Sequence, residues 1–363
     1  MHSDLSHPLL FEVNEVTSVN RLACERSEER QEEAEDWLFV AINRPAGTLL
    51  EFWLRTLSKS RQELGDQWKG LPSEDERFLS RVVSGESYAA ELGRVLIASQ
   101  VFLLFSFDEG WTIQHVIPLF SLSTNLKRAL QAWHGYLVWG HWNDRLLVHM
   151  LPKYEEAFPF VNSHFKKLRD AFCDHLAGIV AFSKIDPSRR SLYKFSSAVT
   201  DQERIRWAAS FGQTLKGMDD PAKTSTWAQW LRQYWKDRLD GIPVPLTEKE
   251  GEEMIEWSIH LAPVFSEVVA DALVTSIGDM QDSFMLTELS ESDLRKQYPK
   301  ESSALVLHVL KNARAFPWDT RWIEPLLTEL ASSTESKPNT RLICDELARL
   351  GYPDAQRLKN LAS

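Results

Sequence analysis

Apolar residues recur every three or four positions along most of the chain, which is the period of an amphipathic helix. In the segment 225–240, apolar side chains lie at offsets 0, +3, +4, +7 and +12 from Trp227. We find no convincing run of alternating apolar and polar residues between turn residues, the pattern typical of strands. The pattern therefore predicts an all-α fold, with helices over 36–43, 48–64, 74–83, 87–105, 126–139, 143–157, 163–182, 201–215, 225–240, 248–277, 302–313, 319–331, 340–350 and 354–361.

Capping residues predict where several of these helices begin and end. In a capping box, a Ser or Thr accepts a hydrogen bond from the backbone three residues later, and a Glu at that position reaches back to the cap. Glycines are expected to end helices because they adopt the left-handed conformation without strain. The predicted boxes are Ser73 with Glu76, Thr200 with Glu203 and Thr247 with Glu250, and the predicted terminal glycines are Gly85, Gly217, Gly241 and Gly351.

The connections between predicted helices are short, and no long polar linker separates them. This arrangement favours an irregular α-solenoid of stacked helical hairpins, similar to HEAT repeats and without a significant sheet. No clean period of 30–45 residues is visible, so any repeat is degenerate. We predict an acidic N-terminal lead-in over 1–36 and one helical repeat-like domain over 37–363, with weak seams near 184–190, 217–225 and 332–340.

The composition limits the cellular compartment and the kinds of binding partner that we expect for this chain. The net charge of −11 opposes nonspecific binding to nucleic acid, which needs clustered Lys and Arg. The three cysteines, Cys24, Cys173 and Cys344, are odd in number and widely spaced, which fits a reducing compartment. The N-terminus lacks the pattern of a signal peptide, and the longest apolar stretch, 95–107, is too short to span a bilayer and is expected to form a buried core helix. We therefore expect a cytoplasmic protein that binds neither nucleic acid nor membranes.

The motifs of common enzyme classes are missing from the sequence. It contains no complete phosphate-binding loop, no Gly-x-Gly-x-x-Gly fingerprint, no nucleophile elbow and no His-Glu-x-x-His or paired Cys-x-x-Cys. The tightest group of potential ligands is His164, Cys173 and His175, and on one helix the two histidines would return to nearly the same face. Two histidines and an unaligned thiol are too few for a closed zinc site. We expect structural roles for them, and a chain that is not an enzyme and holds no metal or cofactor.

The most unusual segment is AWHGYLVWGHWND, residues 132–144. Trp and Tyr carry much of the binding energy at protein interfaces, so this segment is a candidate recognition surface. The alternative is a bulky corner between two helices, because aromatic residues dominate cores as readily as interfaces. Trp235 lies beside the main apolar stripe of its predicted helix and is expected to be exposed. The candidate partner-binding residues are therefore Trp133, His134, Trp139, His141, Trp142 and Trp235.

Three segments carry a family resemblance: FLSRVVSG at 78–85, EGWTIQHVIPLF at 109–120 and AWHGYLVWG at 132–140. They resemble a bacterial helical family, domain of unknown function 4020, and the resemblance extends from about Trp37 to the C-terminus. In that family the helical domain forms the C-terminal part of longer proteins that begin with a sirtuin-like domain. Those proteins are similar to the defence-associated sirtuins, which act against bacteriophage by hydrolysing NAD when infection is sensed.

The resemblance implies a non-enzymatic sensor or regulatory domain. Such a domain would recognise a phage protein and control an associated sirtuin-like effector, so NAD would be bound only by that effector. No NAD-binding residue of a sirtuin can be placed on this sequence, because it has no Gly-rich dinucleotide segment. Two alternatives stay open: an oligomerisation scaffold for the effector, with the chain as a homo-oligomer, and a hydrolase or nuclease whose site is assembled from distant residues. For the last, His164, Cys173, His175 and the segment 133–144 are the places to look.

Overall fold

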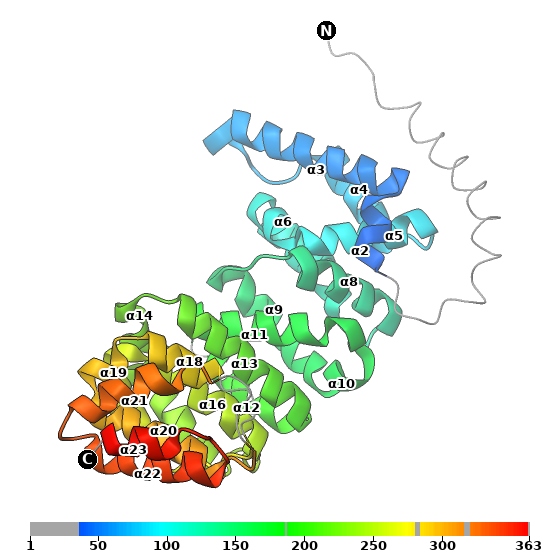
Figure 1. The fold of residues 1–363 in the computed structure, drawn as a ribbon. Helices are drawn as coiled ribbons and strands as arrows, with labels where there is room; N and C mark the ends of the chain where they lie inside the picture. The colour runs from blue at the N-terminus through cyan, green and yellow to red at the C-terminus, as the bar shows by residue number, and fades with distance from the viewer. Residues whose placement is uncertain (1–35, 186, 280–283, 316–319, 362–363) are drawn as a thin grey trace. The chain divides into compact units, whose positions relative to one another are not determined.

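The chain is all-α in the computed structural model, as the periodicity predicts, and its helices form a helical-repeat arrangement (Figure 1). The structure describes residues 36–185, 187–279, 284–315 and 320–361, and no strand occurs in these ranges. The predicted acidic lead-in, residues 1–36, lies outside them except for Asp36.

The described chain divides into two compact units. Unit 1 comprises residues 36–175 and 183–191, and unit 2 comprises residues 176–182 and 192–361. Helices α11 (Arg169–Phe182) and α12 (Pro187–Ala198) each contribute residues to both units. The chain therefore passes between the two units three times, after residues 175, 182 and 191.

In unit 1, α5 (Tyr88–Ser99) and α8 (Leu126–Trp139) approach each other closely at Gly135. A Cβ atom at this position would lie 2.1 Å from the carbonyl oxygen of Val95, so only glycine lets the two backbones meet. The elements of unit 1 are α2 (Trp37–Ile42), α3 (Pro45–Leu64), η2 (Gly65–Gln67), α4 (Ser73–Ser84), α5 (Tyr88–Ser99), α6 (Val101–Phe107), α7 (Glu109–His115), η3 (Ile117–Phe120), α8 (Leu126–Trp139), α9 (Asp144–Ala157), η4 (Phe158–Phe160), α10 (Val161–His164) and η5 (Lys166–Leu168).

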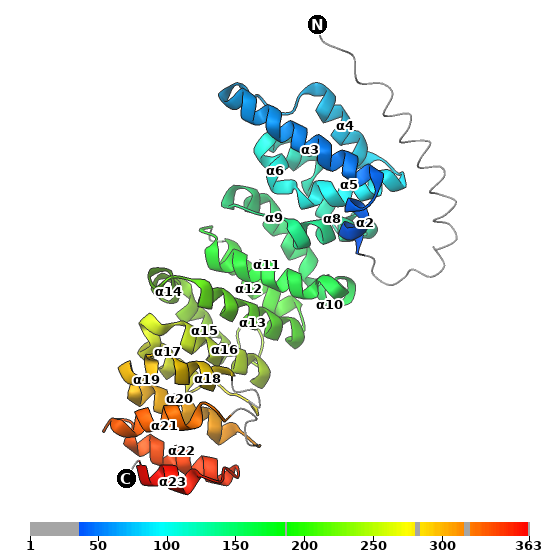
Figure 2. The ribbon, with the colours of Figure 1, turned by 45° about the horizontal axis from the view of Figure 1, so that its top comes forward.

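In unit 2 the helices are stacked one after another in chain order, from α13 to α23 (Figure 2). Each helix buries an apolar face against its neighbours, which is how a helical repeat builds a continuous core. The elements of unit 2 are α13 (Asp201–Gly217), α14 (Asp220–Thr226), η6 (Trp227–Leu231), α15 (Arg232–Leu239), α16 (Glu248–His260), η7 (Ala262–Val264), α17 (Phe265–Ala272), α18 (Phe284–Glu291), α19 (Leu294–Gln297), α20 (Pro299–Asn312), α21 (Ile323–Ser332), α22 (Lys337–Arg349) and α23 (Ala355–Leu361).

Three of the long predicted helices are broken. The segment 87–105 contains a break at Gln100, where α5 and α6 meet with a bend of 77°. The segment 163–182 is interrupted by η5, and Lys166 adopts a positive φ of 34°. The segment 248–277 is interrupted by η7, which contains Pro263, a residue that has no backbone N–H to donate to the preceding helical turn. Helices α7, α12, α18 and α19 are not among the predicted ranges.

The predicted caps form only in part. At α13 the Glu203 carboxylate accepts a hydrogen bond from the Thr200 N–H at 3.0 Å, as in a capping box. At α16 the Thr247 hydroxyl accepts from the Glu250 N–H at 3.3 Å, but the Glu250 carboxylate turns to two arginines instead. Ser73 is already the first residue of α4, with Pro72 at the cap position, so that box is wrong. Among the predicted terminal glycines, Gly241 and Gly351 are left-handed, with φ of 76° and 92°, whereas Gly85 and Gly217 are not.

Most residues of the stretch 95–107, which was predicted to form a core helix, are buried within unit 1. Val95, Ile97, Val101 and Leu104 are fully buried. In the described part of the chain, no single helix is both long and apolar enough to cross a membrane. Helices α5 and α6 reach that length only together, across their 77° bend.

Candidate functional site

Trp133 lies in the core of unit 1, so its predicted place on a recognition surface is wrong. The side chain is fully buried, and its Nε1 donates a hydrogen bond to the Phe120 carbonyl at 3.1 Å. Its ring packs edge-on against Tyr154 and Phe120, with ring centroids 4.8 and 5.2 Å away. Aromatic packing of this kind holds α8, α9 and η3 together.

Trp235 is also fully buried, which corrects the prediction that it is exposed. Its Nε1 donates to the Thr275 hydroxyl at 3.0 Å, and its ring lies edge-on to Trp257 at 5.6 Å. At 100° per residue, Trp235 lies about 80° from Trp227 around the helix axis, between Leu231 at about 40° and Leu239 at about 120°. It therefore belongs to the apolar stripe of its helix.

His134 is largely buried beside the start of α2. Its Nε2 lies 3.6 Å from the Asp36 carboxylate, and 12% of its side chain is exposed. Burial lowers the pKa of the imidazole, and Asp36 opposes that effect. This position makes His134 a contact between α8 and the beginning of α2 and leaves little of it for a partner.

Trp139, His141 and Trp142 remain accessible at the C-terminal end of α8. The Trp139 side chain is 45% exposed, His141 is exposed and Trp142 is half-buried. The His141 ring stands edge-on to Phe102 of α6, with ring centroids 6.5 Å apart. The candidate residues of unit 1 therefore separate into a core part, Trp133 and His134, and an accessible part that begins at Trp139.

Trp139 forms one wall of a groove in unit 1, which we call the Trp139 groove. Helix α3 contributes Leu54 and Arg55 to its lining, α5 contributes Leu96 and α6 contributes Leu103. Glu51, Ser58 and Gln100 complete the lining. The cavity has a volume of about 180 Å³. Pockets for drug-sized ligands measure roughly 300–1,000 Å³, so this one fits a single side chain better than a substrate.

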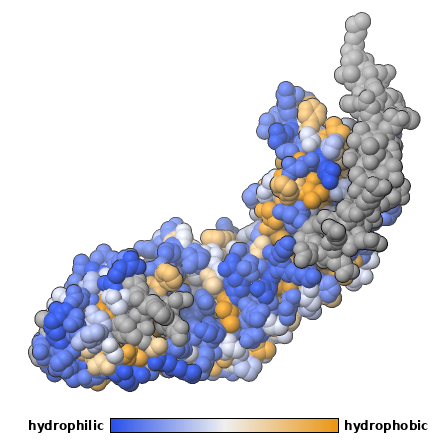
Figure 3. Space-filling view, turned by 45° about the vertical axis from the view of Figure 1, so that its right-hand side comes forward, coloured by the Kyte–Doolittle hydropathy of each residue, from blue (hydrophilic) through white to orange (hydrophobic). Residues whose placement is uncertain are grey.

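Large apolar side chains are exposed on α3 and α8, which line this groove, and on two other helices of unit 1. Phe52 of α3 and Val138 of α8 directly follow and precede lining residues, and they are 68% and 48% exposed. Phe39, Leu49 and Val148 are exposed on α2, α3 and α9. Figure 3 shows hydrophobic surface gathered on unit 1. Exposed apolar surface rimmed by polar residues is typical of a site where another protein binds.

His164, Cys173 and His175 do not form a common site. The predicted helix is broken between the two histidines by η5, so the spacing of 11 residues no longer brings them to one face. His164 lies 2.6 Å from the Ser163 hydroxyl, whereas His175 contacts the Tyr154 hydroxyl at 3.2 Å. Cys173 is fully buried. Burial lowers the pKa of His175 to about 4, so the ring is neutral at pH 7.

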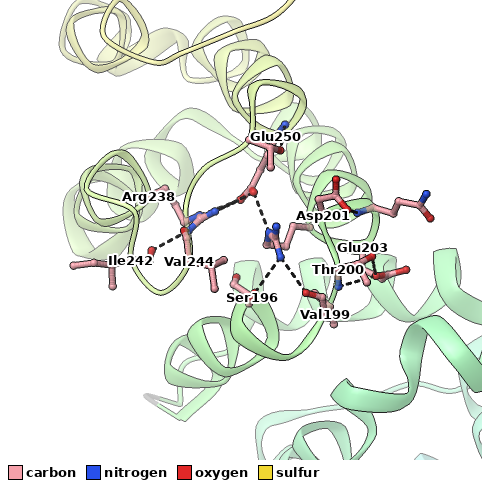
Figure 4. Close-up of polar contacts among 12 residues, drawn as sticks. Ser196, Val199, Thr200, Asp201, Glu203, Arg238, Ile242, Val244 and Glu250 are labelled. Atoms are coloured by element: carbon pink, nitrogen blue, oxygen red, sulfur yellow. Dashed lines mark hydrogen bonds and ion pairs between the residues drawn. The ribbon is translucent and has the colours of Figure 1, made fainter.

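Unit 2 contains a buried ionic network around Glu250 (Figure 4). Glu250 of α16 accepts two hydrogen bonds from Arg238 of α15, at 3.0 and 2.9 Å, and one from Arg204 of α13, at 3.2 Å. Arg238 also donates to the carbonyls of Ile242 and Val244. The side chains of Arg238 and Glu250 are 0% and 2% exposed. This network links three helices and the loop after α15, and we assign it a structural role.

A second group of titratable residues lies on α16 and α18, and sequence reasoning missed it. Burial and the nearby carboxylates of Glu253, Glu288 and Glu252 raise the pKa of Glu256 to about 7. His260, at the end of α16, lies 3.8 Å from Glu288, which also bonds Lys216 of α13 at 2.5 Å. Burial lowers the pKa of His260. A carboxyl group with a pKa near 7 is suited to general acid–base chemistry, but ion networks produce such values too.

Replacing Glu256 by Gln is expected to stabilise the protein at pH 8 and to leave its stability almost unchanged at pH 5. The pKa of Glu256 is raised in the folded state, so the native protein binds more protons than the unfolded chain between pH 4.5 and about 7. Stability therefore falls as the pH rises through this window, and Gln removes the loss. The rise from 4.5 to about 7 is a change of more than a hundredfold in proton affinity, and at about 1.4 kcal/mol for each tenfold change we expect a gain of about 3 kcal/mol at pH 8.

Thermal unfolding of both proteins at pH 5 and pH 8 measures this effect. Glu291→Gln is the matched control, because Glu291 is an exposed carboxylate on α18. Equal melting temperatures of Glu256→Gln and the unchanged protein at pH 8 would contradict the raised pKa.

Comparison with known proteins finds a similarity to a family model over part of the chain. The family "Domain of unknown function (DUF4020)" matches residues 185–346. The segments 78–85, 109–120 and 132–140, on which the resemblance rests, lie outside the matched span. No curated protein and no solved structure matches the chain. Among the residues that the structure describes, no group of three or more His, Cys, Asp or Glu side chains is placed to hold a metal ion.

Proposed function

We propose that this chain is a non-enzymatic protein-interaction module that binds its partner through the Trp139 groove. The observation that carries the proposal is the combination of an apolar cavity with a half-exposed Trp on its wall. Interface hot spots are enriched in Trp and Arg, and both lining residues Trp139 and Arg55 are accessible here. The size of the cavity supports a side-chain anchor more than a substrate.

The biological setting of the proposal comes from the family resemblance. We propose that the module senses a phage protein in a bacterial defence system and controls a sirtuin-like, NAD-hydrolysing effector. Partner binding shifts such an effector only by the difference in affinity between its resting and active states. The match to DUF4020 over residues 185–346 supports the family on which this idea rests.

Affinity purification from phage-infected and uninfected bacteria tests the proposal, with the full chain as bait. We expect a phage protein that is enriched only after infection and whose recovery falls about tenfold, equivalent to about 1.4 kcal/mol, with Trp139→Ala. Phe284→Ala in unit 2 is the matched control, since it removes an aromatic side chain that is 75% exposed. Equal recovery with Trp139→Ala and the unchanged chain would contradict the groove as the binding site.

The two alternatives predict different results in the same experiments. An oligomerisation scaffold yields only further copies of this chain or a sirtuin-like protein, and its mass by light scattering is a multiple of 41.8 kDa. An enzyme yields turnover by the pure chain, and the raised pKa of Glu256 favours the α16–α18 group as its site. We expect no NAD consumption by the pure chain. Turnover that is lost in Glu256→Gln would favour the enzyme.

A further inference from the structure

Helix α3, which contributes residues to the Trp139 groove, carries more basic than acidic residues, although the chain as a whole carries a net charge of −11. Residues 44–64 contain Arg44, Arg55, Lys59 and Arg61, against only two acidic residues, Glu51 and Glu63. Four positions separate Arg55 from Lys59, so both lie on one face of α3. Their side chains are 77% and 78% exposed. The apolar groove is therefore lined by one accessible cation, Arg55, beside Glu51, and Lys59 lies on the same face of α3.

Arg55 and Lys59 each take part in an exposed ion pair. Arg55 bonds Glu51 at 2.6 Å, and Lys59 lies 3.9 Å from Glu63. Exposed ion pairs of this kind contribute about 0–1 kcal/mol, because water competes for both groups. A carboxylate brought by a partner can therefore replace or join the existing pairs at little cost. Charge of this kind also speeds the encounter with a partner of opposite sign.

The volume of the cavity limits the size of the partner side chain that can bind in it, which we call the anchor. A cavity of about 150 Å³ lined by aliphatic and aromatic side chains accommodates a benzene ring. The Trp139 groove has about 180 Å³, with Leu54, Leu96 and Leu103 in its lining. One Phe or Leu side chain fits this volume, and a larger or double anchor does not.

We propose that the Trp139 groove binds an acidic peptide segment with a single Phe or Leu anchor. The anchor fills the cavity against Trp139, and neighbouring Asp or Glu residues of the segment pair with Arg55 and Lys59. This inference rests on the proposed function, since it names the chemistry of the partner for the same groove. The complementary charge is the observation that selects an acidic segment over a neutral or basic one.

Selection from a random peptide display library on the immobilised full chain tests the proposal. The enriched peptides are expected to share one Phe or Leu flanked by Asp or Glu. The best peptide, labelled with fluorescein, is then titrated by fluorescence anisotropy. We expect its dissociation constant to rise about tenfold with Trp139→Ala, about tenfold with the double change Arg55→Glu and Lys59→Glu, and with increasing salt.

Lys296→Glu is the matched control for charge reversal, because Lys296 of α19 is 51% exposed and lies 3.8 Å from Asp293. It is expected to leave the affinity unchanged. Enrichment of neutral or basic peptides, or an affinity that depends on Trp139 but not on Arg55 and Lys59, overturns the acidic partner and leaves the proposed function standing. Binding that is independent of Trp139 overturns both.

The same assay tests whether an acidic segment of the chain itself, instead of a separate partner, occupies the Trp139 groove. The chain itself contains the acidic residues Glu28, Glu29, Glu32, Glu33 and Glu35 shortly before α2. Replacing these five by Gln in the full chain is expected to change the affinity for the peptide less than about threefold. A rise in affinity of about tenfold would mean that this segment competes for the groove, and it would overturn the assignment to a separate partner.

Discussion

Replacing Glu250 by Ala is expected to lower the free energy of unfolding by about 3–5 kcal/mol, because it leaves buried arginine charge without its partner. Arg238 is 0% exposed and Arg204 is 11% exposed, so neither guanidinium regains full hydration when the carboxylate is lost. The backbone carbonyls that Arg238 also contacts, those of Ile242 and Val244, carry no net charge to compensate. Urea denaturation followed by far-ultraviolet circular dichroism measures the loss.

Glu248→Ala is the control for this change. Glu248 is exposed in the first turn of the same helix, and its removal is expected to cost at most about 1 kcal/mol through the helix dipole. A double change of Arg238 and Glu250 to Met is expected to cost less than Glu250→Ala alone, because it removes charge from both sides of the pair. A loss below about 1 kcal/mol for Glu250→Ala would contradict the structural role of the network.

The sequence predicted the helical class and several helices closely, because these depend on local periodicity. Helix α8 covers the predicted range 126–139, and α13 begins at the predicted Asp201. Breaks were harder to predict where they depend on tertiary contacts. Gln100 and Lys166 interrupt helices without being proline or glycine, so neither break has a strong local signal. The Thr247 box failed for a similar reason, since Glu250 finds stronger partners in two arginines 12 and 46 residues earlier in the chain.

The candidate site was predicted only in part. Trp139, His141 and Trp142 were singled out from composition, and they lie at an accessible end of α8. The part of the lining from α3, with Leu54 and Arg55, was not predicted, because α3 lies about 80 residues earlier in the chain and reaches the groove only through the fold. Trp235 was misplaced because it was set beside the apolar stripe, although at 100° per residue it falls between Leu231 and Leu239 of that stripe. The group around Glu256 was missed because α18, which carries Glu288, was not predicted.

Trp133 and Trp139 provide the sharpest test of this division between core and surface. At 3.6 residues per turn, six positions along α8 place the two side chains about 120° apart around the helix axis. Trp133 faces the aromatic core, whereas Trp139 faces the groove and is 45% exposed. Trp133→Ala is expected to cost about 3–5 kcal/mol, because it opens a cavity that the surrounding rings cannot close. Trp139→Ala is expected to cost about 1 kcal/mol, because much of that side chain is already in water.

Two measurements on the same two variants, unfolding in urea and binding of the peptide, are expected to give opposite results. Trp133→Ala is expected to lose stability and, where it remains folded, to keep its affinity for the selected peptide, whereas Trp139→Ala is expected to keep its fold and lose affinity. Trp133→Phe guards against a variant that fails to fold, since it retains most of the ring packing and loses only the hydrogen bond to the Phe120 carbonyl. If Trp139→Ala is the more destabilised of the two, the segment 132–144 is a packed corner throughout, and the Trp139 groove loses its role as a binding site.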